Sequence, residues 1–112
     1  MIVTAWNNGA HMRSGIGYGF RVSLADRDEL FKKEWTSIEV TIEGQGDPFL
    51  VTIDTDTFWS PTGHELHSKE IGLWLRKCGL APWSMGKPPV FILNPTSENH
   101  FSVERVKKGK GK

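Results

Sequence analysis

The chain has 112 residues, of which 38% are hydrophobic, and 14 lysines and arginines nearly balance 13 aspartates and glutamates. This length fits one domain with a real core, and the apolar fraction is well above that of a disordered chain. No apolar run approaches the roughly 20 residues that a membrane-spanning helix needs, and no signal peptide is recognisable. The single cysteine, Cys78, cannot form an internal disulfide, which fits a reducing cytoplasm. We therefore expect a cytoplasmic protein and, in the absence of a long apolar run, no membrane contact.

Charge is distributed unevenly along the chain. Residues 26–56 contain nine acidic and three basic residues, whereas residues 107–112 contain four lysines interleaved with glycine. Without those four lysines the formal net charge of +1 becomes −3. A lysine and glycine segment has no apolar face to bury, so ordering it gains little against the entropy cost. We therefore expect a single globular domain over residues 1–106 and a disordered basic tail over residues 107–112.

The N-terminal part of the chain predicts two strands and a short helix. Ile2–Trp6 is a first strand that ends at an Asn-Asn-Gly turn signal. Alternating apolar and polar residues in Phe20–Leu24 predict a second strand. Three apolar side chains of that strand are expected to face the core: Phe20, Val22 and Leu24. Asp26 and Glu29 have the spacing of an N-terminal cap pair, which predicts a helix over about residues 27–34.

The clearest signal in the sequence is a β-hairpin. Ile38–Glu43 and Phe49–Asp54 both alternate strictly between apolar and polar residues, and a glycine-rich turn joins them. Strict alternation is typical of an antiparallel sheet with one buried face. We expect this hairpin at the centre of the sheet, with Val40 and Val51 buried.

The main helix is predicted over about residues 64–78. Thr62 and Glu65 have the spacing of a capping box, and Ser68 is an alternative start. Five residues form an apolar stripe at helical spacing: His67, Ile71, Trp74, Leu75 and Cys78. Gly79 fits the left-handed position that ends many helices, with Leu80 packing back on the last turn.

Two further strands are predicted near the C-terminus. Val90–Leu93 is apolar on both faces, residues 94–99 have the composition of a turn, and a last strand runs from His100 to about Val106. Taken together, these elements predict an α+β domain. Its sheet would be a strongly bent antiparallel sheet or a partly open barrel of about six strands, closed at one end or face by the main helix.

Two motifs invite a chemical interpretation. His64, His67 and Glu70 would share one face of a helix and are weak candidates for a metal site, but no third His or Cys lies close. Because His67 also lies on the apolar stripe, a hydrogen-bonded histidine in the core is the competing explanation. No Gly-x-Ser-x-Gly elbow supports a catalytic serine, so we expect no catalytic residues, no metal and no cofactor.

Glycines at every second position, Gly15, Gly17 and Gly19, suggest a phosphate-binding loop at first sight. The spacing differs from that of phosphate-binding loops, and a predicted strand follows where such loops use the N-terminus of a helix. Close packing of the backbone is the better explanation of these glycines.

The chain has five tryptophans and six phenylalanines, more than a core of this size can always bury. Exposed Trp and Tyr beside Arg form good recognition surfaces, whereas tryptophans at the rim of a small barrel simply complete its core. Both interpretations are open. The residues that we expect to contact a partner are Arg13, Tyr18, Arg21, Trp59 and Trp83.

Several segments resemble small uncharacterised bacterial proteins. The segments are Gly17–Arg21, Phe58-Trp59, Ile71–Leu75, Gly79–Trp83 and Pro88–Phe91. The resemblance implies no activity and transfers no functional residue. The order of the elements is also similar to that of small barrel-like modules, some of which bind DNA, which is a likeness of fold alone.

These observations favour a non-catalytic binding module that uses an aromatic and glycine-lined surface. A protein and a nucleic acid are both open as partners, and a homodimer is compatible with the sequence. The basic tail favours a nucleic acid, and the charge of −3 on the rest of the chain disfavours it. The alternative is a protein that binds a small ligand, or an enzyme, with a pocket near His64 and His67.

Overall fold

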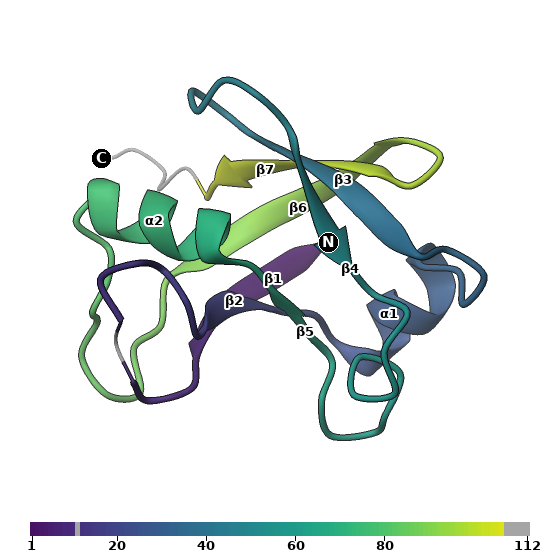
Figure 1. The fold of residues 1–112 in the computed structure, drawn as a ribbon, viewed down its shortest axis with the longest axis horizontal. Helices are drawn as coiled ribbons and strands as arrows, with labels where there is room; N and C mark the ends of the chain where they lie inside the picture. The colour runs from purple at the N-terminus through teal and green to yellow at the C-terminus, as the bar shows by residue number, and fades with distance from the viewer. Residues whose placement is uncertain (11, 107–112) are drawn as a thin grey trace.

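A mixed sheet organises the structure, a computed structural model that describes residues 1–10 and 12–106. The predicted tail at residues 107–112 lies outside these residues. Over the described ranges the strands are β1 (Ile2–Asn7), β2 (Tyr18–Arg21), β3 (Ser37–Ile42), β4 (Phe49–Thr52), β5 (Glu65–His67), β6 (Val90–Ser97) and β7 (His100–Arg105). The helices are α1 (Leu24–Leu30) and α2 (Lys69–Lys77), which lie at opposite ends of the long axis (Figure 1).

The strand order is β4-β3-β7-β6-β1-β2-β5, and every neighbouring pair is antiparallel except β3 and β7. The two end strands, β4 and β5, contact each other, so the sheet curls into a nearly closed barrel (Figure 1). The predicted α+β domain with a partly open barrel is confirmed. In the described residues it has seven strands rather than about six, and the parallel pair makes the sheet mixed.

The predicted hairpin is present, and its faces are those expected from the alternation. Val40 and Val51 are both 1% exposed, and Ile38 pairs with Val51 across the two strands. The expectation of a central position is wrong, because β4 is an end strand and β3 its only sheet neighbour. The hairpin joins the rest of the sheet through the parallel pairing of β3 with β7.

The first helix begins and ends earlier than predicted. Ser23, rather than Asp26, is the N-cap, and its hydroxyl accepts a hydrogen bond from the backbone N–H of Asp26 at 3.1 Å. The helix therefore starts at Leu24, whose side chain is exposed instead of facing the core, and it ends at Leu30 rather than Glu34. Phe31 follows directly and is buried.

The main helix begins at Lys69, and the alternative start at Ser68 is the correct one. The Ser68 hydroxyl accepts a hydrogen bond from the backbone N–H of Ile71, and the preceding residues form β5. The predicted C-terminal motif is present: the N–H of Gly79 donates to Arg76 O at 3.0 Å and that of Leu80 to Leu75 O at 2.8 Å. Neither described helix has the length and apolarity of a membrane-spanning segment.

Strand β6 is longer than predicted, and only one of its faces is buried. It continues to Ser97, through the predicted turn, and a bulge between Pro95 and Ser97 accommodates the proline. Phe91 is buried while Val90 is 43% exposed, so only one of the two apolar faces of the strand is buried.

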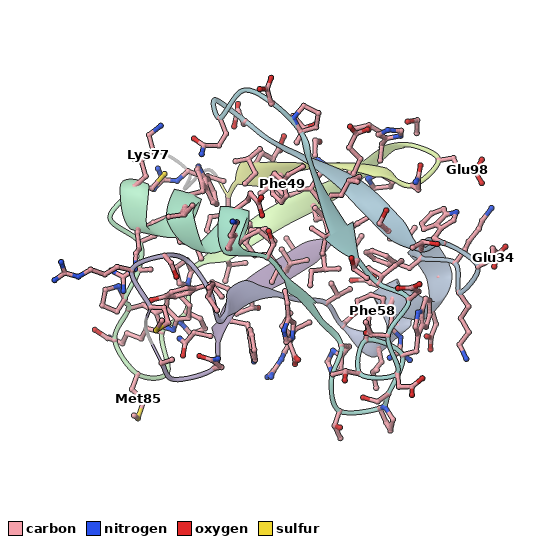
Figure 2. All side chains as sticks on the ribbon, viewed as in Figure 1. Glu34, Phe49, Phe58, Lys77, Met85 and Glu98 are labelled. Atoms are coloured by element: carbon pink, nitrogen blue, oxygen red, sulfur yellow. The ribbon has the colours of Figure 1, made fainter. Side chains whose placement is uncertain are left out.

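The core fills the barrel and the space under α2. It contains Tyr18 and Phe20 from β2, Phe91 from β6, Phe101 from β7 and Trp74 from α2, all at most 4% exposed. Charged side chains such as Glu34, Lys77 and Glu98 lie at the periphery (Figure 2).

Candidate functional site

The histidine cluster that suggested a metal site does not form. His67 lies on β5 and is exposed, Glu70 lies in the first turn of α2, and the Nδ1–H of His64 donates to the backbone oxygen of Val22. The expectation that these residues share one helical face is wrong because residues 65–67 pair with β2 as a strand. No three His, Cys, Asp or Glu residues in the described part of the chain are arranged to hold a metal ion.

The structure brings two of the predicted contact residues together. The rings of Tyr18 and Trp83 meet edge to face at 5.9 Å, and Tyr18 is completely buried. Arg76 of α2 also contacts the Tyr18 ring, with its guanidinium carbon 5.8 Å from the ring centre. Tyr18 thus supports the half-buried Trp83 from beneath rather than presenting its own ring to a partner.

The other predicted contact residues lie elsewhere. Arg13 is exposed in the loop before β2, and Arg21 is half-exposed on the outer face of β2. Trp59 is half-buried, with Arg27 over its ring at 5.2 Å. The predicted residues therefore do not form one continuous patch.

The glycine segment serves the packing of the backbone, as its interpretation from sequence suggested. A Cβ atom on Gly15 would lie 2.8 Å from the backbone nitrogen of Leu73, and one on Gly72 would lie 2.6 Å from the Cα atom of Gly15. Loop and helix α2 thus meet backbone to backbone. Gly19 is equally crowded by the backbone of Leu66 on β5.

A cleft of about 620 Å³ lies beside Trp83, and we call it the Trp83 cleft. It lies between the loop that follows α2 and the strands β6 and β7. Eight of its twelve lining residues are apolar, three of them prolines, and its charged lining residues, Lys87 and Arg105, are both basic. The lining residues are Gly79, Leu80, Pro82, Trp83, Ser84, Lys87, Pro88, Pro89, Val90, Phe91, Arg105 and Val106.

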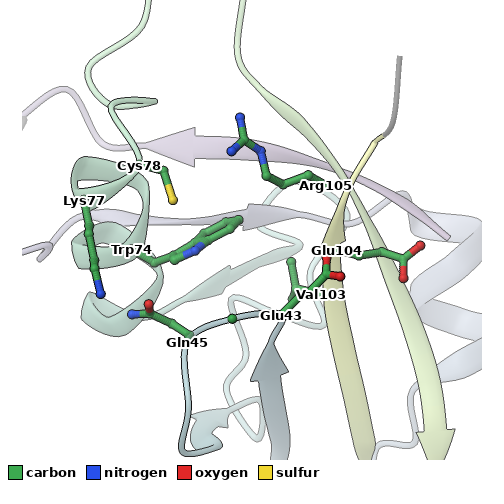
Figure 3. Close-up of a pocket in the computed structure, with 9 residues that line it drawn as sticks. Glu43, Gln45, Trp74, Lys77, Cys78, Val103, Glu104 and Arg105 are labelled. Carbon is green, nitrogen blue, oxygen red and sulfur yellow. The ribbon is translucent and has the colours of Figure 1, made fainter. Parts of the chain in front are cut away.

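Arg105 also borders a smaller hollow of about 280 Å³ (Figure 3). Figure 3 shows Trp74 and Cys78 on the α2 side and Arg105 on the strand side of this hollow. Two acidic residues, Glu43 and Glu104, and two basic residues, Lys77 and Arg105, line the hollow, so it has no dominant charge.

Two residues of the outer face were not among the predicted contact residues. Trp6 of β1 and His67 of β5 are both opposite Gly19 of β2, and their rings stack at 4.4 Å across the position where a side chain is missing. Beside them a buried carboxylate, Glu65, accepts a hydrogen bond from Arg21 Nε and forms an ion pair with the same guanidinium. In the sequence, this arrangement is indicated only by the alternation of polar and apolar residues at 65–67. Three residues are too few to distinguish a strand from a helix.

Comparisons with protein-family models, curated proteins and solved structures find no match to this chain.

Proposed function

We propose that this chain is a non-catalytic binding module and that the Trp83 cleft is the surface that holds a protein partner. The observation that carries this proposal is the combination of size and lining: about 620 Å³, walls of Trp, Pro, Val and Leu, and basic groups alone as charges. Tryptophan in a desolvated, well-supported position is the residue type on which binding energy concentrates at protein interfaces. Tyr18, whose own ring contacts Arg76, supplies that support.

A protein segment fits this cleft better than a nucleic acid does. Single-stranded nucleic acids need several exposed rings on which successive bases stack, whereas the Trp83 cleft offers one half-buried indole. Val90 and Val106 add exposed apolar surface, at 43% and 41%. With Lys87 and Arg105 at the walls, the expected partner is a segment with an apolar anchor and flanking acidic residues.

The test is a selection of random peptides on the full chain, followed by affinity measurements on variants. We expect the selected peptides to combine an aromatic or aliphatic residue with Asp or Glu. Trp83→Ala should weaken their binding by about 30-fold, the effect of removing a typical hot spot, and Lys87→Glu should weaken it by several-fold.

Met85 provides a matched control, because it lies in the same loop, is fully exposed and does not line the cleft. Met85→Ala should bind the selected peptides as the wild type does. Peptides whose affinity is the same for Trp83→Ala and the wild type would contradict the proposal. Single-stranded DNA whose binding depends on Trp83 would favour the nucleic-acid alternative instead.

A further inference from the structure

The barrel is open between β4 and β5, and side chains from both sides of this gap form a third pocket. The pocket has a volume of about 280 Å³, and we call it the seam pocket. Thr52 ends β4, Thr55 and Thr57 belong to the following loop, and Glu65 and His67 lie on β5. It is separate from the Trp83 cleft, with which it shares no lining residue.

Glu65 is the unusual member of this pocket. Its side chain is only 6% exposed, although a carboxylate is costly to bury without partners. One oxygen, Oε2, accepts from Arg21 Nε at 3.0 Å and lies 2.9 Å from Arg21 Nη2. The other oxygen, Oε1, has His67 Nε2 at 3.7 Å as its nearest charged neighbour, which is beyond hydrogen-bond distance. Oε1 of this mostly buried side chain therefore has no hydrogen-bond partner among the described residues, on the side of His67, which also lines the pocket.

The surroundings of the pocket are acidic. The loop after β4 alternates Asp54, Thr55, Asp56 and Thr57, so that two exposed carboxylates flank the pocket-lining threonines. Neither Asp54 nor Asp56 makes an ion pair with a described residue. The carboxylates of Glu65, Asp54 and Asp56 carry three negative charges, and the guanidinium of Arg21 carries one positive charge. The resulting negative potential favours the binding of a cation.

Arg27 contacts a residue that lines the pocket, and it does not change this balance. Arg27 donates to the backbone oxygen of Phe58, the apolar residue of the pocket, at 2.9 Å. Its own charge is paired with Asp28, at 3.0 Å.

We propose that the seam pocket binds an alkylammonium group, either of a free primary amine or of a lysine side chain. An ammonium group has three N–H donors and no acceptor, which matches a pocket lined by an acceptor-only carboxylate and by the hydroxyl groups of threonines. Phe58, 2% exposed, supplies an apolar wall for the methylene groups. A metal ion fits less well, because no set of three His, Cys, Asp or Glu ligands exists among the described residues.

The direct experiment is an NMR titration of the full chain with n-butylammonium chloride, with n-butanol as the uncharged probe of equal length. We expect the resonances of Thr57, Glu65 and His67 to shift with n-butylammonium, with a dissociation constant on the order of 1 mM that weakens as salt is added. Equal shifts with n-butanol, or shifts that lie outside the pocket, would overturn the proposal.

Variants then test the carboxylate. Glu65→Gln should weaken n-butylammonium binding by at least tenfold, whereas Glu29→Gln should not, although it changes the net charge equally. Glu29 is an exposed residue of α1 outside the pocket. If Glu65→Gln fails to fold, the double variant Asp54→Asn/Asp56→Asn decides: affinity reduced several-fold supports the proposal and unchanged affinity refutes it.

The source of the amine is distinguished by two further probes, N-acetyl-lysine amide and N-acetyl-norleucine amide. Tighter binding of the lysine amide than of n-butylammonium identifies a protein side chain as the ligand. Weaker binding of the lysine amide identifies a free amine. Equal binding of the lysine and norleucine amides contradicts recognition of the ammonium group.

Discussion

Replacing Gly72 by alanine tests the close contact between α2 and the loop before β2. In an isolated helix this substitution stabilises, because alanine is the better helix former by about 1 kcal/mol. In this protein the new methyl group would lie 2.6 Å from the Cα atom of Gly15 and closer still to its carbonyl oxygen. Two opposing effects therefore act at one position, and the structure determines which is larger.

The steric effect should prevail. Overpacking a well-packed core costs about 1–3 kcal/mol. The upper end applies at Gly72 because its neighbour is backbone, which cannot turn aside as a side chain does. Subtracting the helix-forming advantage leaves a destabilisation of about 2 kcal/mol. For a domain of this size that is a fall in melting temperature of about 10 °C.

Thermal unfolding followed by circular dichroism measures this effect. Lys77→Ala, an exposed change in the same helix, serves as the control and should alter the free energy of unfolding by no more than about 0.5 kcal/mol. A Gly72→Ala variant that melts above the wild type would refute the reasoning, since helix propensity would then act without a steric penalty.

Three further predictions concern the core, a buried arginine and the tail. Val40→Asp should cost several kcal/mol in the free energy of unfolding, because Val40 is 1% exposed; cooperative unfolding at wild-type denaturant concentrations would contradict this. Arg27→Leu should cost about 2–4 kcal/mol in urea unfolding, since it leaves the carbonyls of Phe58 and Ser60 without their donor; a change below about 0.5 kcal/mol would show that water replaces it. Deletion after Val106 should abolish retention on DNA at low salt and leave the melting temperature nearly unchanged; sequence-selective binding by the truncated chain would place recognition elsewhere.

Local patterns in the sequence predict the elements whose signal is local. The hairpin of β3 and β4 is found because its strict alternation leaves one choice of buried face. The end of α2 is found because Gly79, at a φ of +72°, is the residue type that this position prefers. The start of α2 is misplaced because residues 65–67 fit a helical period, and only their pairing with β2, more than 40 residues earlier, makes them a strand.

The candidate sites are less predictable than the fold. Tyr18 and Trp83 are far apart in the sequence and meet only because the loop after α2 returns over β2. The sequence assigns Glu65 to a helix cap rather than to a binding site, since a lone glutamate is ordinarily solvated. Its burial is a property of the gap between β4 and β5, two strands that contact without being sheet neighbours. Pairings of this kind leave no periodic signal in either segment.

The placement of β6 and β7 between β1 and β3 has a consequence for the order of events during synthesis. Met1 and Leu93, 92 positions apart, exchange two hydrogen bonds, and β3 must wait for β7 before it has a second neighbour. During synthesis β1 to β5 therefore leave the ribosome before β6 and β7, the strands that join them into one sheet, have been made. Contacts of such long range make folding slow, and the unpaired strands are open to wrong partners in the meantime. We expect nascent chains that end before β6 to bind chaperones and to be degraded readily by proteases, and resistance to proteolysis to arise abruptly once β7 has left the ribosome.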